Sequence, residues 1–297
     1  MSTGLSIYIS VIVLLNIFGC VWLILWTSKK RAGEASAGEV TGHEWDGLQE
    51  YNNPLPRWWL YLFYITIVFA LVYLVLYPGL GKWQGILGWN QVKQWQEEVQ
   101  QAESKYGPIF AQYSDKPIPA LLEEPQALAM GKRIFLNYCA VCHGSDARGA
   151  PGFPNLTDDE WLWGGTPERI EETIAIGRQG TMPAWGSTLG EEGVEAVAHY
   201  VLSLSGRKHD AALARKGEEK FKTLCVACHG VDGKGNPMLG APDLTNNSWL
   251  YGGSLGAIKK TIAEGRKGHM PAHGEFLGKD KVHLVAAYVY SLTHKSK

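Results

Sequence analysis

Cys139-Ala140-Val141-Cys142-His143 recurs 86 residues later as Cys225-Val226-Ala227-Cys228-His229. Further matching segments follow each motif at an offset of 88 residues, so the second copy has two extra residues in the loop after its histidine. The carboxy-terminal part of the chain is therefore an internal duplication. The matched segments are Asn155-Leu-Thr with Asp243-Leu-Thr, Trp161-Leu-Trp-Gly-Gly165 with Trp249-Leu-Tyr-Gly-Gly253, and Met182-Pro-Ala with Met270-Pro-Ala.

The repeated Cys-x-x-Cys-His motif is the attachment signature of haem c. Two thiols add to the porphyrin, and the adjacent imidazole becomes an axial ligand of the iron. We therefore predict two covalently bound haem c groups. The attachment residues are Cys139, Cys142, Cys225 and Cys228, and the first axial ligands are His143 and His229.

The second axial ligand is expected to be methionine, whose thioether raises the reduction potential of a haem. Only Met182 and Met270, of five methionines, occupy equivalent positions in the two repeats. The spacing leaves open whether each methionine ligates the iron of its own repeat or of the other. Ligation within one repeat places fewer demands on how the two domains are arranged. Irons with two protein ligands have no open position for a substrate, so we expect electron transfer and no catalytic residues.

Two alternatives concern the same residues. Cysteine pairs outside the cytoplasm also form disulfides, and a zinc site would require an additional His-x₃₋₅-His cluster. His269 and His273 provide such a cluster once, in the second repeat, and the first repeat has none. The same two histidines leave bis-histidine ligation of the second haem as a minor alternative.

The amino-terminal quarter predicts two membrane spans. Residues Leu5–Trp26 contain no charge and at ~1.5 Å per residue reach about 33 Å, and Trp58–Tyr77 is also uncharged. Basic residues are concentrated in the loop between the spans, so the positive-inside rule predicts a cytoplasmic loop and two external termini. Cys20 is expected to be only a small apolar residue. The loop bases are Lys29, Lys30, Arg31 and Arg57.

The predicted fold is all-α, with an N-terminal transmembrane helical hairpin followed by two tandem class I cytochrome c domains. The hairpin anchor occupies residues 1–88 and an amphipathic helical connector occupies 89–124, at the membrane surface or against a partner. The cytochrome c domains are expected at 125–206 and 207–297, with no segment of strand periodicity. Their expected helices are Gln126–Tyr138, one starting at Thr166-Pro167-Glu168, Glu191–Leu204, Leu213–Leu224, Leu255–Gly265 and Lys279–Leu292.

Charge is divided unevenly along a nearly neutral chain. The 297 residues carry a formal net charge of -1, which argues against nucleic-acid binding. The 12 Trp, 13 Tyr and 8 Phe side chains exclude a disordered chain. Residues 125–205 have 5 bases and 10 acids, whereas residues 211–297 have 13 bases and 7 acids. Such opposite fields steer the docking of charged redox partners or hold the two domains together.

The whole chain resembles the dihaem subunit III of cbb3-type cytochrome c oxidases. The specific part of the resemblance is the anchor loop, Gly42-His-Glu-Trp-Asp-Gly47 and Asn53-Pro-Leu-Pro-Arg-Trp-Trp59, beside the two haem motifs. The resemblance implies a subunit of the bacterial inner membrane, with its haem domains in the periplasm. It implies that electrons arrive from a soluble or membrane-bound cytochrome c. They would then pass to a monohaem cytochrome c subunit and to the catalytic haem-copper subunit.

Two other function classes use the same residues. One is the cytochrome subunit of a periplasmic dehydrogenase complex, and the other is a dihaem peroxidase. A peroxidase requires a haem that opens a coordination position. A dehydrogenase complex would contain no haem b or copper.

Overall fold

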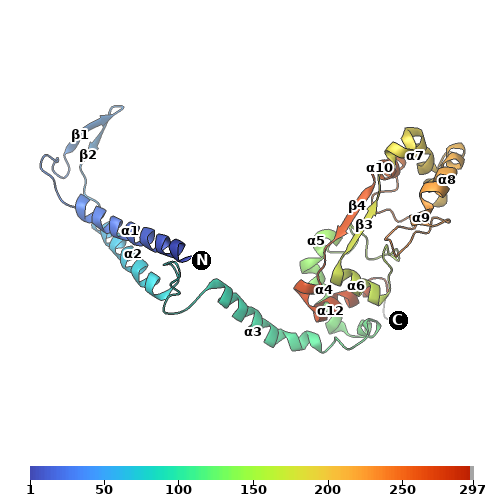
Figure 1. Ribbon diagram of the computed structural model, residues 1–297, viewed down its shortest axis with the longest axis horizontal. Helices are drawn as coiled ribbons and strands as arrows, with labels where there is room; N and C mark the ends of the chain where they lie inside the picture. The colour runs from blue at the N-terminus through green and yellow to red at the C-terminus, as the bar shows by residue number, and fades with distance from the viewer. Residues whose placement is uncertain (295–297) are drawn as a thin grey trace. The chain divides into compact units, whose positions relative to one another are not determined.

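The computed structural model describes residues 1–294, and the chain forms two compact units, Met1–Ser104 and Lys105–Lys297 (Figure 1). The last three residues of the predicted second cytochrome domain, 295–297, lie outside the described part. The chain is mostly helical.

The first unit contains two long apolar helices, α1 (Thr3–Thr27) and α2 (Arg57–Leu76). Both are long and apolar enough to cross a membrane, and none of their residues is buried within the structure. The segment after α2 returns to the start of α1, where the Lys82 amide donates to Ser6 Oγ at 2.8 Å. The two predicted spans coincide with these helices, except that Tyr77 lies just beyond the end of α2.

A β-hairpin between the two helices corrects the all-α prediction. Strands β1 (Val40–Trp45) and β2 (Leu48–Tyr51) pair antiparallel, with Trp45 opposite Leu48. Asp46 and Gly47 form the turn with φ of 50° and 82°, the left-handed backbone that tight hairpins require. The Asp-Gly dipeptide between apolar residues was the sequence signal for this hairpin.

The predicted connector contains helix α3 (Gln91–Ala111) and the 3₁₀ helix η1 (Ile118–Glu123). Trp95 and Val99 on α3 are exposed, whereas Ile118 and Leu121 on η1 are buried in the second unit. The connector therefore has one part with an uncovered apolar face and one part that belongs to a core.

The helices of the second unit agree with most of the predicted bounds. The Thr166 side chain accepts a hydrogen bond from the Arg169 amide at the start of α6, as expected for an N-cap. Helix α7 contains a break at Gly190, where φ is 66°, so its regular part begins at the predicted Glu191. The elements are α4 (Pro125–Tyr138), α5 (Ala140–His143), α6 (Pro167–Ile176), α7 (Gly186–Leu204), α8 (Ala211–Leu224), α9 (Val226–His229), α10 (Leu255–Glu264), α11 (Gly274–Leu277) and α12 (Lys279–Ser291).

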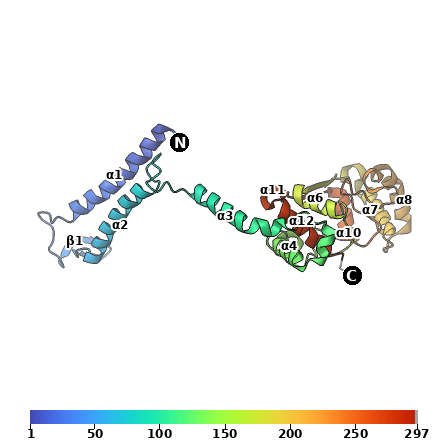
Figure 2. The same cartoon turned by 90° about the horizontal axis from the view of Figure 1, so that it is seen from below.

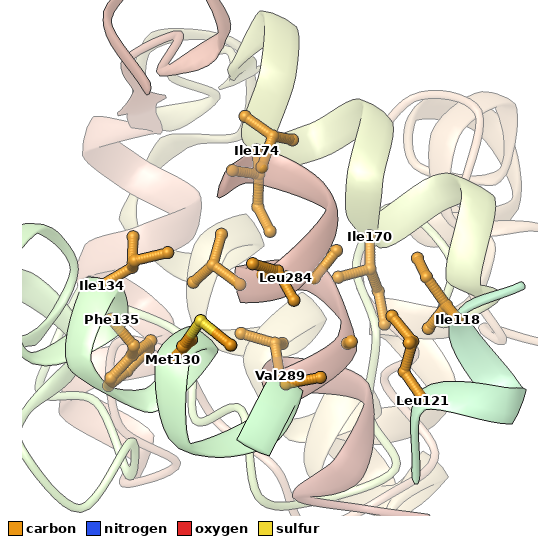
Figure 3. Packing of buried hydrophobic residues seen from close by; sticks show 14 of the residues in the cluster. Ile118, Leu121, Met130, Ile134, Phe135, Ile170, Ile174, Leu284 and Val289 are labelled. Carbon is orange, nitrogen blue, oxygen red and sulfur yellow. The ribbon is translucent and has the colours of Figure 1, made fainter. Parts of the chain in front are cut away.

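The two repeats exchange their carboxy-terminal segments. Helix α12 of the second repeat packs on α4 and α6 of the first, and α7 of the first repeat packs on α8 and α10 of the second. In Figure 2, α4, α6 and α12 lie together at one end of the unit, and α7, α8 and α10 lie at the other. Figure 3 shows the first core, in which Leu284 and Val289 of α12 lie in one cluster with Met130, Ile134 and Phe135 of α4.

Aromatic pairs mark the same exchange in both cores. Phe135 lies against Tyr288 with ring centroids 5.4 Å apart, and the equivalent Phe221 lies against Tyr200 at 5.1 Å. Each pair joins one repeat to the other. The domain boundaries 125–206 and 207–297 follow the sequence repeat and stay a prediction. The packing instead groups α4, α6 and α12 in one core and α7, α8 and α10 in the other.

A two-stranded antiparallel sheet joins the two ends of the unit and is a second correction to the all-α prediction. Strands β3 (Arg178–Met182) and β4 (Arg266–Met270) occupy equivalent positions in the repeats. Gly180 pairs with Gly268 at the centre, and Arg178 and Met182 pair with Met270 and Arg266 at the ends. The sheet is thus symmetric about its glycine pair. Each strand carries the chain from one core to the other (Figure 1).

Candidate haem sites

Each attachment motif lies on one helical turn. Cys139 ends α4 and begins α5, which carries Cys142 and ends at His143. The second motif has the same arrangement at the junction of α8 and α9. Residues three and four positions apart share a helical face. The two thiols and the imidazole of each motif can therefore bind the same haem group.

The two motif histidines are held by backbone carbonyls. His143 Nδ1 lies 3.0 Å from the Pro154 carbonyl oxygen, and His229 Nδ1 lies 3.2 Å from that of Pro242. A carbonyl only accepts, so Nδ1 carries the proton and Nε2 is left as the unprotonated nitrogen that binds a metal. This hydrogen bond also fixes the orientation of each ring.

Burial keeps these imidazoles neutral. It lowers the pKa of His143 and of His229, and this effect exceeds the opposing effect of the proline carbonyls. Nearby His273 lowers the pKa of His143 further. Each motif histidine is therefore in its ligating form at neutral pH.

The first thiol of each motif is held in its protonated form. Burial, with a smaller contribution from the second cysteine, raises the pKa of Cys139 and of Cys225 to about 11. None of the five cysteines is paired in a disulfide. Within residues 1–294, no group of three or more His, Cys, Asp or Glu side chains is arranged to hold a metal ion. The described part of the chain thus gives no support to a disulfide or zinc site.

The candidate methionines lie on the inward face of the β3–β4 sheet. Residues 178, 180 and 182, and equally 266, 268 and 270, are the less exposed positions of their strands. Met270 packs against the core that includes Cys139, and Met182 packs against the core that includes Cys225. Each methionine therefore shares a core with the attachment motif of the other repeat, which is the crossed arrangement that the spacing left open.

The geometry disfavours His269 as an alternative ligand. It occupies an exposed position of β4, and successive strand residues point to opposite faces, so its side chain faces away from that of Met270. His273 is half-buried and close enough to His143 to lower its pKa, and its Nδ1 lies 2.9 Å from the Pro271 carbonyl oxygen, so its Nε2 is left unprotonated as in the motif histidines.

A buried donor without a partner supports a bound group in the second core. Trp249 Nε1 is buried and has no hydrogen-bond partner among the described residues, although a buried indole N–H usually has one. Trp249 packs against the core that contains Met182 and Cys225, and Arg207 lies 5.7 Å from its ring. Together with the thiols, imidazoles and thioethers, this unpaired donor fits a haem c group with polar substituents.

Two arginines at equivalent positions lie on the same sheet face as the methionines. The Arg178 guanidinium lies 5.3 Å from the Trp163 ring, and that of Arg266 lies 4.5 Å from the Tyr251 ring. Neither these arginines nor the carbonyls of Pro154 and Pro242 were predicted from the sequence. All four lie at repeat positions, so the alignment of the repeats was the signal that could have found them.

Comparisons with known proteins identify the family of the chain. The family described as "Cytochrome C oxidase, cbb3-type, subunit III" matches residues 126–201 and 212–289, which together are more than half of the chain. This chain belongs to that family. The N-terminal domain of cytochrome oxidase-cbb3, FixP, matches residues 37–84, which include the hairpin and α2.

Curated members of the cbb3 family match over nearly the full chain. The cbb3-type cytochrome c oxidase subunit CcoP of Rubrivivax gelatinosus is 44% identical, over 99% of this chain and 97% of the relative. The subunit FixP of Azorhizobium caulinodans is 42% identical, over 87% of this chain and 94% of the relative. The subunit CcoP of Azospirillum brasilense is 40% identical, over 89% and 98%.

Membership of the cbb3 family confirms the predicted function class. The chain is a c-type cytochrome that transfers electrons within an oxidoreductase complex and works with other oxidase subunits. Its two apolar helices and its family agree with an inner-membrane protein. The dehydrogenase and peroxidase alternatives gain no support from these relatives.

Proposed function

We propose that the chain carries two covalent haem c groups and passes electrons from a cytochrome c donor towards the oxygen-reducing centre of a cbb3-type oxidase. The donor is a soluble or membrane-bound cytochrome c. The next acceptors are the monohaem cytochrome c subunit and then the catalytic haem-copper subunit. Bound haem c supplies a one-electron Fe(III)/Fe(II) couple.

The duplicated cysteine–histidine turn is the observation that carries this proposal. In both copies the imidazole is oriented through Nδ1 by a proline carbonyl, and Nε2 is free to bind iron. A pyridine haemochrome assay on the purified complex tests it. Two covalent haems per chain are expected, and one or none would contradict the proposal.

We further propose that each iron takes its two ligands from different repeats. His143 is paired with Met270, and His229 is paired with Met182. Support comes from the two cores, because each contains the motif cysteine of one repeat and the methionine of the other.

A chain with a single haem tests the crossed ligation. The double variant Cys139→Ala/Cys142→Ala retains only the haem at Cys225 and Cys228, and a content of one haem per chain is the control for its folding. In that background, Met182→Ala should abolish the absorption band of methionine-ligated ferric haem, and Met270→Ala should leave it. The opposite outcome would establish ligation within each repeat.

Residues 1–88 are proposed to form a transmembrane hairpin in the bacterial inner membrane, in contact with lipid, with residues 89–124 as the connector. The loop bases favour a cytoplasmic β1–β2 hairpin, with both termini in the periplasm. The sequence segments 125–206 and 207–297 would be class I cytochrome c domains outside the cytoplasm.

Labelling of single cysteines with a membrane-impermeant maleimide tests this topology. In spheroplasts, Glu275→Cys in α11 should react at once. Glu50→Cys in β2 should react only after permeabilisation. The unaltered chain controls for reaction at Cys20, and the reverse pattern would refute the orientation.

We propose that the acidic loop residues Asp158 and Asp159 attract and orient the cytochrome c donor through their charge. The basic residue Lys259 is less available, because its Nζ lies 3.3 Å from Glu195 Oε2. Reversal of both aspartates should slow electron input at low ionic strength and weaken its salt dependence. Reversal of Lys259 and Lys260 is the comparison, and insensitivity to both changes would exclude steering by these groups.

A further inference from the structure

The two repeats differ in the charge beside otherwise equivalent arginines. Arg178 and Arg266 occupy the same position in β3 and β4, and each Nε donates to a threonine hydroxyl, Thr173 at 2.9 Å and Thr261 at 3.0 Å. In the antiparallel register, Arg178 lies opposite Met270 and Arg266 lies opposite Met182. Directly opposed residues share a face, so each arginine accompanies one candidate iron ligand.

Only the first of these arginines has an acidic partner. Arg178 Nη2 lies 3.0 Å from Glu172 Oε2, and Arg169 also pairs with Glu172, at 2.8 Å. Hydrogen bonds from Arg178 and Arg169 lower the pKa of Glu172 to about 2, so this carboxylate is charged at every working pH.

The equivalent position in the second repeat carries the opposite charge. Lys260 of α10 corresponds to Glu172 of α6, and it lies 3.9 Å from Glu264 on its own helix. Within residues 1–294, Arg266 has no acidic side chain at ion-pair distance. The guanidinium beside Met182 therefore has no carboxylate partner among the described residues, whereas the one beside Met270 shares the Glu172 carboxylate with Arg169.

From this difference we propose that Glu172 and Lys260 make the two haem potentials unequal and thereby set the direction of electron flow. The inference rests on the proposed haem sites and their crossed ligands. Reduction adds one negative charge, so an uncompensated cation nearby favours the reduced form. The haem of His229 and Met182 has the higher potential, and the haem of His143 and Met270 has the lower.

The order of transfer follows from these potentials. His143 and Met270 would hold the haem that gives up the electron, and His229 and Met182 would hold the haem that takes it up, with no proton required. The first haem is the entry point for electrons from the donor. The second haem passes them on to the next subunit.

Redox titration of the purified holo-complex, followed by c-haem absorbance, tests the proposal. Glu172→Gln should raise the reduction equilibrium constant of the lower-potential haem about threefold, because a surface charge acts through a high effective dielectric constant. For one electron this equals about 28 mV. Lys260→Gln should lower the constant of the higher-potential haem by a similar factor.

Matched variants identify local effects. Glu168→Gln on α6 and Lys216→Gln on α8 remove the same charges from exposed positions without altering the arginine contacts, and both should leave the two potentials unchanged. Met270→His and Met182→His assign the titration steps, since loss of the thioether lowers the potential of the haem it ligates. Glutamine is close in shape to glutamate and limits structural change.

The outcomes separate this inference from the proposed function. If the complex holds two haems per chain but Glu172→Gln behaves like Glu168→Gln, the potential-setting role is refuted and the haem sites stand. A higher potential at the Met270-ligated haem would also refute it. A haem content below two would instead contradict the sites themselves.

Discussion

Substitution of Gly131 by alanine should destabilise the first core. Gly131 lies in α4 where α12 crosses it, and an added Cβ would overlap the Leu284 carbonyl oxygen and lie 2.8 Å from Tyr288 Cβ. Backbone atoms cannot rotate away, so the helices must separate. Helix–helix contact at this point leaves room only for glycine.

The expected magnitude follows from two opposing effects. Overpacking of a core costs about 1–3 kcal/mol. Alanine regains about 0.8–1 kcal/mol of helix propensity over glycine. The net loss of unfolding free energy is then at most about 2 kcal/mol, or up to about 8 °C in Tm for a unit of this size.

Thermal unfolding of the detergent-purified holo-chain, followed by circular dichroism in the haem band, measures this loss. Gly256→Ala in α10 is the matched control, because a Cβ there meets no atom within 4 Å and should leave stability equal or higher. Gly217→Ala, at the equivalent crossing of α8 by α7, should behave like Gly131→Ala. Equal stability of the Gly131 and Gly256 variants would refute the reasoning.

Three further predictions concern single side chains. Glu172 has a depressed pKa, so its ion pair stabilises the fold above its usual pKa of 4.5 and is lost as pH falls towards about 2. Glu172→Gln should therefore lose less stability than the unaltered chain across that window in acid unfolding, and an unchanged pH profile would contradict this. Thr166→Ala removes the N-cap of α6 and should cost about 1 kcal/mol in denaturant unfolding, whereas Thr166→Ser should not. Trp249→Phe removes a buried donor that has no described protein partner, so it should change the reduction potential of the second haem. An unchanged potential in a redox titration would contradict a role of this donor at the haem.

The local features of the chain were predictable from sequence. The attachment motifs, the apolar spans and the cap at Thr166 each depend on neighbouring residues, and they appear in the structure where they were expected. The β1–β2 hairpin could also have been predicted, because Asp46-Gly47 is a strong turn signal. Only its strands, short and exposed, lacked a clear alternating pattern.

The exchange between repeats was not predictable, because both repeats carry the same interface residues. Phe135 could pack on Tyr200 as well as on Tyr288, and the sequence gives no preference between these equivalent partners. Strand β3 likewise finds its partner in the other repeat, at a register that no local pattern indicates. Each strand follows a glycine with a φ of 72°, Gly177 before β3 and Gly265 before β4, so this local feature does not distinguish the repeats either.

Rapid mixing of the fully reduced oxidase complex with oxygen tests the central claim most directly. If the chain relays electrons, both of its covalent c haems should become oxidised within one turnover, and added reduced cytochrome c should reduce them again. Oxygen consumption at full rate while these haems stay reduced would contradict the account.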